Sequence, residues 1–252
     1  MELSFNIRVK IKEAWILYKK YFGIFLLLTL LTIFIQSFNQ KESSSISLLI
    51  QVINILLSYV WIRSVLGLID HNKFNPFSKE ILPSLLQFWN YIKTTLLFFV
   101  LCFLPIIIAI FSFLVFILVN IRIVPGGIEY YYLLPLYFYP AICFFLIISL
   151  VPSFYLLGRL IFTRYLCVEK NQGAVKSIKE SWDLTEGQGW YLFGKSFVIG
   201  LFVILGFVAF FVGSIITYPI GMILLVMLYR SFKKAKEIKV NNDKLDLITD
   251  LE

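Results

Sequence analysis

Six long apolar runs divide this chain and restrict what it can fold into. Each run is close to the ~20 residues that a helix needs to cross the ~30 Å hydrocarbon core of a bilayer. Polar and apolar residues do not alternate over long stretches, which argues against a transmembrane β-barrel. The six predicted spans are residues 21–37, 46–67, 95–119, 131–158, 191–212 and 216–232.

The composition agrees with burial in lipid. Hydrophobic residues make up 60% of the 252 residues and charged residues 15%, whereas about 25% of residues are charged in soluble domains. A soluble domain of this length exposes a large surface, which this sequence could not cover with polar side chains. We therefore predict an all-α polytopic membrane protein, with residues 1–236 as one transmembrane domain and residues 237–252 as a polar tail.

The final apolar stretch, residues 191–229, is too long for a single span. One helix of that length would measure roughly 58 Å, about twice the thickness of the bilayer core. The chain therefore has to turn, and Gly213 and Ser214 offer a break. Pro219 suits the first turn of the following helix, because a backbone N–H is not needed there.

Positive charge predicts the orientation of the spans. With six spans, one side of the membrane receives residues 38–45, 120–130 and 213–218, which contain only Lys41 and Arg122 of the 23 Lys and Arg residues. Cytoplasmic segments carry an excess of these residues. We therefore expect a multi-pass protein of a prokaryotic plasma membrane with both termini in the cytoplasm. Tryptophan favours the headgroup level, and the predicted interfacial anchors are Trp15, Trp89, Trp182 and Trp190.

Each predicted pair of spans follows a shorter segment of mixed polarity. These segments, residues 3–19, 79–93 and 173–187, are typical of helices that lie in the membrane surface, here on the cytoplasmic side. Residues 11–17 (IKEAWIL) and 178–184 (IKESWDL) match at five of seven positions. The match suggests a unit of one surface helix and one two-span hairpin, used three times in parallel orientation. Chance similarity between two membrane-boundary segments is the alternative.

Three arginines are the candidate lipid- or phosphate-binding residues. Arg63 lies near the end of the second span, and Arg159 and Arg164 follow the fourth. A guanidinium group can hold phosphate through two parallel hydrogen bonds, so these residues could bind an anionic lipid at the headgroup level. Snorkelling, in which a long side chain only anchors a helix end, is the simpler interpretation.

Prolines interrupt two of the predicted spans, and each removes a backbone hydrogen-bond donor. A broken helix in a membrane can line a cavity, whereas a bend is the simpler outcome. A cavity would favour an alternative function, a transporter or channel for a small or lipid-like solute. The candidate kink residues are Pro105, Pro135, Pro140 and Pro152.

Groups that carry out chemistry are scarce. No Asp or Glu lies deep in a predicted span, which argues against a pump that works through buried carboxylates. Three widely separated cysteines and the single His71 give no metal-ligand spacing, and no nucleic-acid motif accompanies the basic residues. We therefore expect no metal, no cofactor, no enzymatic activity and no nucleic-acid partner.

The segment 159–195 resembles the membrane domain found ahead of some glycerophosphodiester phosphodiesterases and in related six-span bacterial membrane proteins. The resemblance implies a helical membrane module without an activity of its own. Beside six spans the chain has no room for the phosphodiesterase barrel, which would need about 250 further residues. The matching features are Arg159, Arg164, Tyr165, Glu169, Gly173, Ser181, Trp182 and Trp190.

These observations together predict a non-enzymatic membrane module. We expect it to bind anionic membrane lipid, or a membrane or cytoplasmic protein partner, at its cytoplasmic face.

Overall fold

The computed structural model describes residues 5–38, 44–71, 76, 81–123, 130–208 and 212–249. All regular structure within these residues is α-helical, which confirms the predicted fold class. The helices are α1 (Ile7–Lys20), α2 (Phe22–Phe38), α3 (Ser44–His71), α4 (Leu85–Ile123), α5 (Tyr130–Leu160), α6 (Thr163–Lys170), α7 (Ala174–Leu184), α8 (Gly189–Val208) and α9 (Val212–Thr249).

Five of the described helices are long and apolar enough to cross a membrane. They overlap the second to sixth predicted spans. The helix that overlaps the fifth predicted span ends at Val208, short of the predicted end at 212. The candidate that overlaps the fourth predicted span, Ile147–Lys170, joins the end of α5 to α6. The first predicted span corresponds to α2, which reaches the required length only when it is counted together with α1, and those two helices meet at a bend of 91°. The chain is therefore a multi-pass helical protein with five apolar spans, or six with the bent pair.

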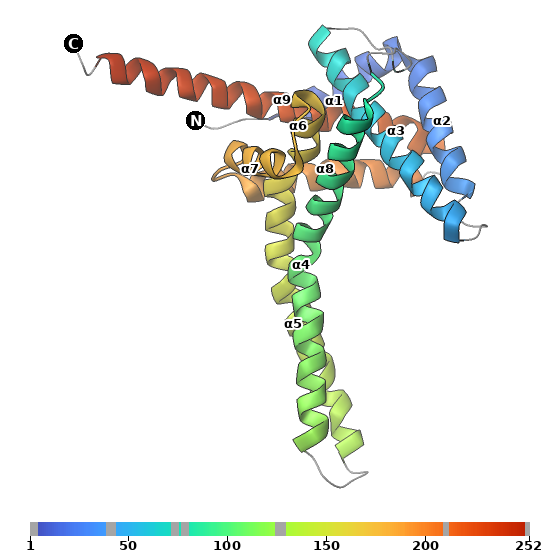
Figure 1. The fold of residues 1–252 in the computed structure, drawn as a ribbon, viewed down its shortest axis with the longest axis vertical. Coiled ribbons are helices and arrows are strands. Elements are labelled where there is room, and N and C mark those ends of the chain that lie inside the picture. The colour runs from blue at the N-terminus through green and yellow to red at the C-terminus, as the bar shows by residue number, and fades with distance from the viewer. Residues whose placement is uncertain are drawn as a thin grey trace.

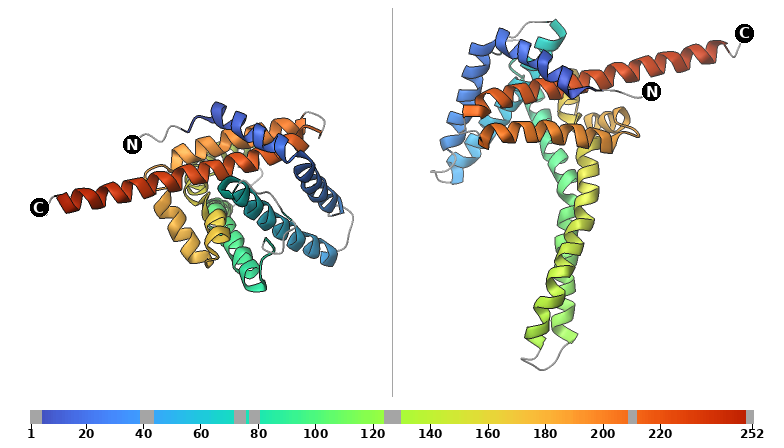
Figure 2. Two further views of the ribbon diagram at one scale, coloured as in Figure 1. Left: turned by 90° about the horizontal axis from the view of Figure 1, so that it is seen from above. Right: turned by 180° about the vertical axis from the view of Figure 1, so that it is seen from behind.

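Two helical hairpins dominate the shape. The α4–α5 hairpin projects far from the rest of the molecule, while α8 and α9 lie side by side and run across its direction (Figures 1 and 2). The polar end of α9 extends beyond the other helices. In this arrangement the two hairpins cannot both stand along the normal of one flat bilayer, so at least one of them is tilted.

The main hydrophobic core is formed mainly by buried residues of α1, α2, α3, α6, α8 and α9. Trp61 of α3 is almost completely buried, with its ring stacked on Phe25 at 5.8 Å and edge-on to Tyr218 at 5.5 Å. The rings of Phe162 and Tyr229 are also fully buried and lie 5.3 Å apart. Aromatic side chains thus hold the crossing helices together by close contact.

Two of the three predicted surface helices are separate elements. α1 buries Ala14 and Tyr18 but leaves Val9 and Ile16 exposed, and α7 corresponds to the predicted segment 173–187. Both helices carry the matching heptapeptide. The first and third predicted units therefore share the order of one shorter helix followed by two longer ones, and the position of α1 and α7 in a membrane surface stays a prediction.

The prediction of a separate surface helix over residues 79–93 is wrong. Its described part from Leu85 onward belongs to α4, because no helix-breaking residue separates it from the apolar run. The Ser84 hydroxyl accepts a hydrogen bond from the backbone N–H of Gln87, and the Gln87 side chain accepts one from the N–H of Ser84. This capping box begins α4, so Pro83 precedes the helix instead of lying in its first turn.

The final apolar stretch turns as predicted but at an earlier position. α8 ends at Val208 and α9 begins at Val212, so Gly213, Ser214 and Pro219 all lie inside α9 instead of between the two helices. A side-chain carbon on Gly213 would lie only 2.5 Å from the carbonyl oxygen of Gly206. These glycines therefore allow two helices to touch, instead of ending one of them.

Candidate functional site

The predicted kink residues lie inside continuous helices. α4 continues through Pro105, and α5 continues through Pro135, Pro140 and Pro152, so none of these residues ends a helix. The side chain of Pro135 falls outside the described residues. The proposed bends stay a prediction.

The four predicted tryptophan anchors all lie at the surface. Their exposed fractions are 37% for Trp15, 52% for Trp89, 40% for Trp182 and 52% for Trp190. Lys19 lies over the Trp15 ring at 5.1 Å, and Lys93 lies over the Trp89 ring at 5.3 Å. An exposed indole beside a cation suits the headgroup level of a membrane, where both groups meet a polar environment.

Arg159 has the contacts of a structural residue. Its side chain is almost completely buried, donates a hydrogen bond to the carbonyl oxygen of Thr185 at 2.9 Å and lies over the Trp182 ring at 4.2 Å. The hydroxyls of Ser181 and Thr185 donate to the carbonyl oxygen of Arg159 at 3.0 and 2.9 Å. These bonds fasten the end of α5 to α7.

A close crossing of α5 and α8 lies beside Arg159. A side-chain carbon on Gly158 would lie 2.1 Å from the carbonyl oxygen of Gly189, and one on Gly189 would lie 2.9 Å from both Arg159 and Tyr155. The resemblance to a known family pointed to Arg159 but not to these two glycines. Their packing role depends on which helices cross, which hydropathy does not reveal.

Arg63 is half-buried on α3 and donates a hydrogen bond to the carbonyl oxygen of Val168 at 3.0 Å. This carbonyl belongs to the last turn of α6, where backbone acceptors lack partners within the helix. A cation at a helix C-terminus is stabilising. Arg63 of α3 therefore caps the C-terminal end of the neighbouring helix α6.

Arg164 differs from the other two arginines. It is half-buried, and its guanidinium group makes no hydrogen bond or ion pair with any described residue. It lies over the ring of Phe98 at 5.4 Å. The surroundings of this cation are thus aromatic and contain no carboxylate that pairs with it.

Arg230, in contrast to Arg164, forms ion pairs with two carboxylates. It donates to Glu169 at 2.6 Å and also pairs with Asp70. Glu169 accepts a further hydrogen bond from Lys233 at 2.7 Å and one from the hydroxyl of Tyr229. This cluster joins α3, α6 and α9. The resemblance named Glu169, but no sequence pattern indicated its partners, because Arg230 lies 61 residues from Glu169 and 160 residues from Asp70.

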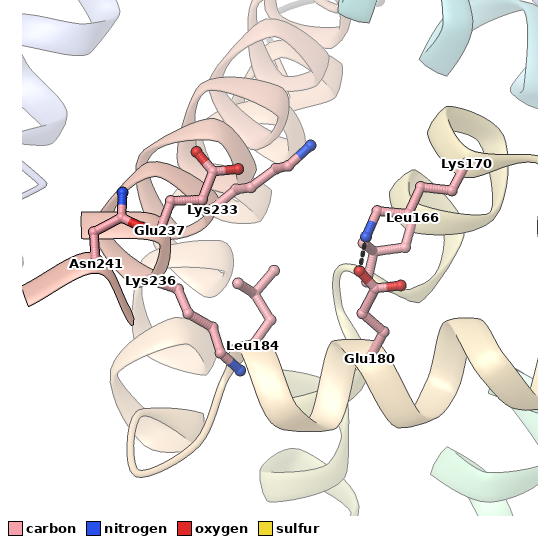
Figure 3. A pocket seen from close by; sticks show the side chains of 8 residues that line it. All are labelled: Leu166, Lys170, Glu180, Leu184, Lys233, Lys236, Glu237 and Asn241. Atoms are coloured by element: carbon pink, nitrogen blue, oxygen red, sulfur yellow. Dashed lines mark hydrogen bonds and ion pairs between the residues drawn. The ribbon is translucent and has the colours of Figure 1, made fainter. Parts of the chain in front are cut away.

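A polar cleft of about 400 Å³ lies between α6, α7 and α9 (Figure 3). Lys233 and Glu237 project from α9 on one side, and an ion pair between Lys170 and Glu180 stands on the other. The lining residues are Leu166 and Lys170 of α6, Glu180 and Leu184 of α7, and Lys233, Lys236, Glu237 and Asn241 of α9.

Glu180 is one of the two carboxylates that line this cleft. It accepts hydrogen bonds from Lys170 and from the Gln172 amide, the latter at 2.8 Å. Burial alone would raise the pKa of Glu180, but the bonds from Lys170 and Gln172 outweigh burial and hold this pKa below its ordinary value. Glu180 is therefore ionised at neutral pH and forms an ion pair with Lys170.

A second hollow of about 340 Å³ shares Lys170 and Glu180 with the first. Lys176, Lys179 and Asp183 of α7 also line it, together with Gln172. The Lys170–Glu180 ion pair thus stands between two basic hollows.

The structure also shows where the metal-binding residue types lie. Within the described part of the chain, no three His, Cys, Asp or Glu side chains lie together as a metal ion would require. Cys102 and Cys167 are buried free thiols, and the side chain of Cys143 falls outside the described residues.

No family model, no curated protein and no solved structure matches this chain. The resemblance to the phosphodiesterase membrane domain therefore stays a prediction.

Proposed function

We propose that this chain is a non-enzymatic membrane module that binds an anionic lipid by its phosphate group through Arg164. The observation that supports this proposal is the Arg164 guanidinium, which has no hydrogen bond or ion pair among the described residues. Arg164 lies in α6, near the end of a candidate membrane span, Ile147–Lys170, which joins the end of α5 to α6.

An unpaired cation is unfavourable in such a place. Apolar surroundings penalise a charge strongly unless it is paired and hydrogen-bonded, and ionisable residues inside membrane spans commonly mark functional sites. The ring of Phe98 compensates only part of the charge, because a cation–π contact contributes about 0.5–2 kcal/mol. A lipid phosphate would supply both the negative charge and the acceptors for the guanidinium fork.

Arg63 fits a supporting role in the same proposal. Its bond to Val168 uses one end of its guanidinium group, and no described carboxylate pairs with it. Val168 lies one helical turn after Arg164 on α6. Arg63 would therefore add positive charge near the phosphate, whereas Arg159 would act through its contacts to α7.

The orientation belongs to the same proposal: both termini lie in the cytoplasm of a prokaryotic cell, and the module faces the anionic inner leaflet. A fluorescent protein that folds only in the cytoplasm tests this when it is fused after residue 252. Fluorescence in intact cells is the expected result. An active periplasmic reporter at the same position would contradict the orientation.

Native mass spectrometry of the protein extracted in mild detergent tests lipid binding. We expect the wild type to retain an anionic lipid, and Arg164→Gln to lose it while keeping its elution volume in size-exclusion chromatography. Lys195→Gln is the matched control, because Lys195 also lies on a spanning helix and over an aromatic ring, at 5.1 Å from the ring of Tyr191.

Two results would contradict the proposal. One is unchanged lipid retention in Arg164→Gln. The other is a stoichiometric protein partner that copurifies while no lipid is retained selectively, which would favour a scaffold or accessory subunit.

A further inference from the structure

The cleft between α6, α7 and α9 has a chemistry unlike that of the Arg164 site. We propose that this cleft binds the phosphate group of a water-soluble molecule, and that the phosphate replaces Glu180 as the partner of Lys170. This inference does not rest on the proposed lipid site, since the two sites share no residue.

The lining of the cleft favours a polar ligand. Only Leu166 and Leu184 among its lining residues are apolar, and the others carry a charge or an amide. The charged and amide groups of this lining can solvate a phosphorylated solute. A volume of about 400 Å³ lies in the range of small-molecule sites.

Cations outnumber anions in the cleft and the hollow beside it. Their lysines come from all three helices, Lys170 from α6, two from α7 and two from α9, and they face the carboxylates of Glu180, Glu237 and Asp183. Lysine is a common phosphate ligand, which acts as a point charge on a flexible stem. Lys233 is held by Glu169, and Lys236 donates to the carbonyl oxygen of Asp183. An incoming phosphate would compete for these two lysines, whereas Lys176 and Lys179 form no ion pair with any described residue.

Lys170 is the residue at which exchange can occur. It lines both hollows, and its present partner Glu180 comes from the neighbouring helix α7. The two side chains keep exposed fractions of 41% and 30%, so solvent and ligand reach the ion pair. Such exposed pairs are weak, and a multiply charged phosphate can compete for the lysine.

The exchange makes two variants act in opposite directions. Glu180→Gln removes the competing anion and should tighten phosphate binding by roughly two- to fivefold, the factor that corresponds to a weak surface ion pair. Lys170→Gln removes the cation and should weaken binding. Damage to the fold would weaken binding in both variants, so a gain in affinity cannot come from a structural defect.

Isothermal titration of the protein in phosphatidylcholine nanodiscs, with pyrophosphate as the probe, measures these affinities. Glu237→Gln is a second test of the gain, because Glu237 lines the cleft without an ion pair to any described residue. Its binding should also tighten. Lys195→Gln on α8 lies outside the cleft and should leave the affinity unchanged.

Three outcomes would overturn the proposal. They are the absence of saturable pyrophosphate binding to the wild type, weaker binding in both glutamate variants, and an affinity that is the same in Lys170→Gln as in wild type. The same titration in nanodiscs that also contain phosphatidic acid tests the source of the phosphate. If this lipid weakens pyrophosphate binding to wild type but not to Lys170→Gln, membrane lipid reaches the cleft and the assignment to a soluble ligand is wrong.

Discussion

Replacing Gly158 by alanine should destabilise the protein, although the same change normally favours a helix. The new methyl carbon would lie 2.1 Å from the carbonyl oxygen of Gly189 and 3.1 Å from the β-carbon of Phe193. The first contact involves backbone, which cannot rotate away. α5 and α8 would therefore have to separate by about 1 Å to reach an ordinary contact distance.

The size of the effect follows from two opposing contributions. Overpacking of a close contact typically costs 1–3 kcal/mol, and more where the backbone has to move, while Gly to Ala in a helix interior gains up to ~1 kcal/mol. The separation would also disturb the stacked rings of Phe154 and Phe193, whose centroids lie 4.8 Å apart. We expect a net loss of about 1–3 kcal/mol.

The apparent melting temperature of the detergent-solubilised protein measures this loss. At 252 residues, each kcal/mol corresponds to roughly 2–4 °C for a two-state protein. Gly194→Ala on α8 is the matched control, because nothing lies within 4 Å of the position that its β-carbon would occupy. It should leave the melting temperature unchanged or raise it. If both variants behave alike, the close crossing of α5 and α8 does not exist in solution.

Two further predictions concern charged residues. Glu169→Gln should lower the stability by about 1–3 kcal/mol, because Arg230 and Lys233 lose a shared, half-buried partner. The control Glu13→Gln breaks only an exposed pair and should change the melting temperature little. The second prediction concerns pH: because the pKa of Glu180 is lowered in the fold, its ion pair stabilises the protein above the ordinary glutamate pKa and loses this effect as pH falls through the lowered value. The difference in melting temperature between wild type and Glu180→Gln should therefore shrink on acidification, and a constant difference would contradict the assigned ion pair.

The spans were predictable from the sequence because hydropathy over ~20 residues is a local property. Helix boundaries were not, since they depend on which backbone groups find partners. The segment 79–93 has the polarity of a surface helix, yet the capping box at Ser84 and the absence of a breaker make it part of α4. Gly213 suggested a turn, but its lack of a side chain serves the contact with Gly206.

The candidate site was predictable only as a set of arginines. Arg159 and Arg164 have similar sequence surroundings, but α7 covers one of them and the other lies over Phe98 of α4. That difference depends on contacts between helices. For the same reason, no sequence pattern indicated that Lys170 would meet Glu180 and face Lys233 across a cleft.

The tilt of the projecting α4–α5 hairpin should depend on the thickness of the membrane. The apolar part of α4, Leu85–Val115, has 31 residues and buries only 17% of its most apolar window in the protein, compared with 56% for α9. At full length it would measure roughly 46 Å, well beyond the ~30 Å hydrocarbon core. Such a mismatch is relieved by tilting the helix or thickening the lipid around it. Because the hairpin projects from the rest of the molecule (Figure 1), a thinner bilayer would tilt it further, and α6 at its base would move with it.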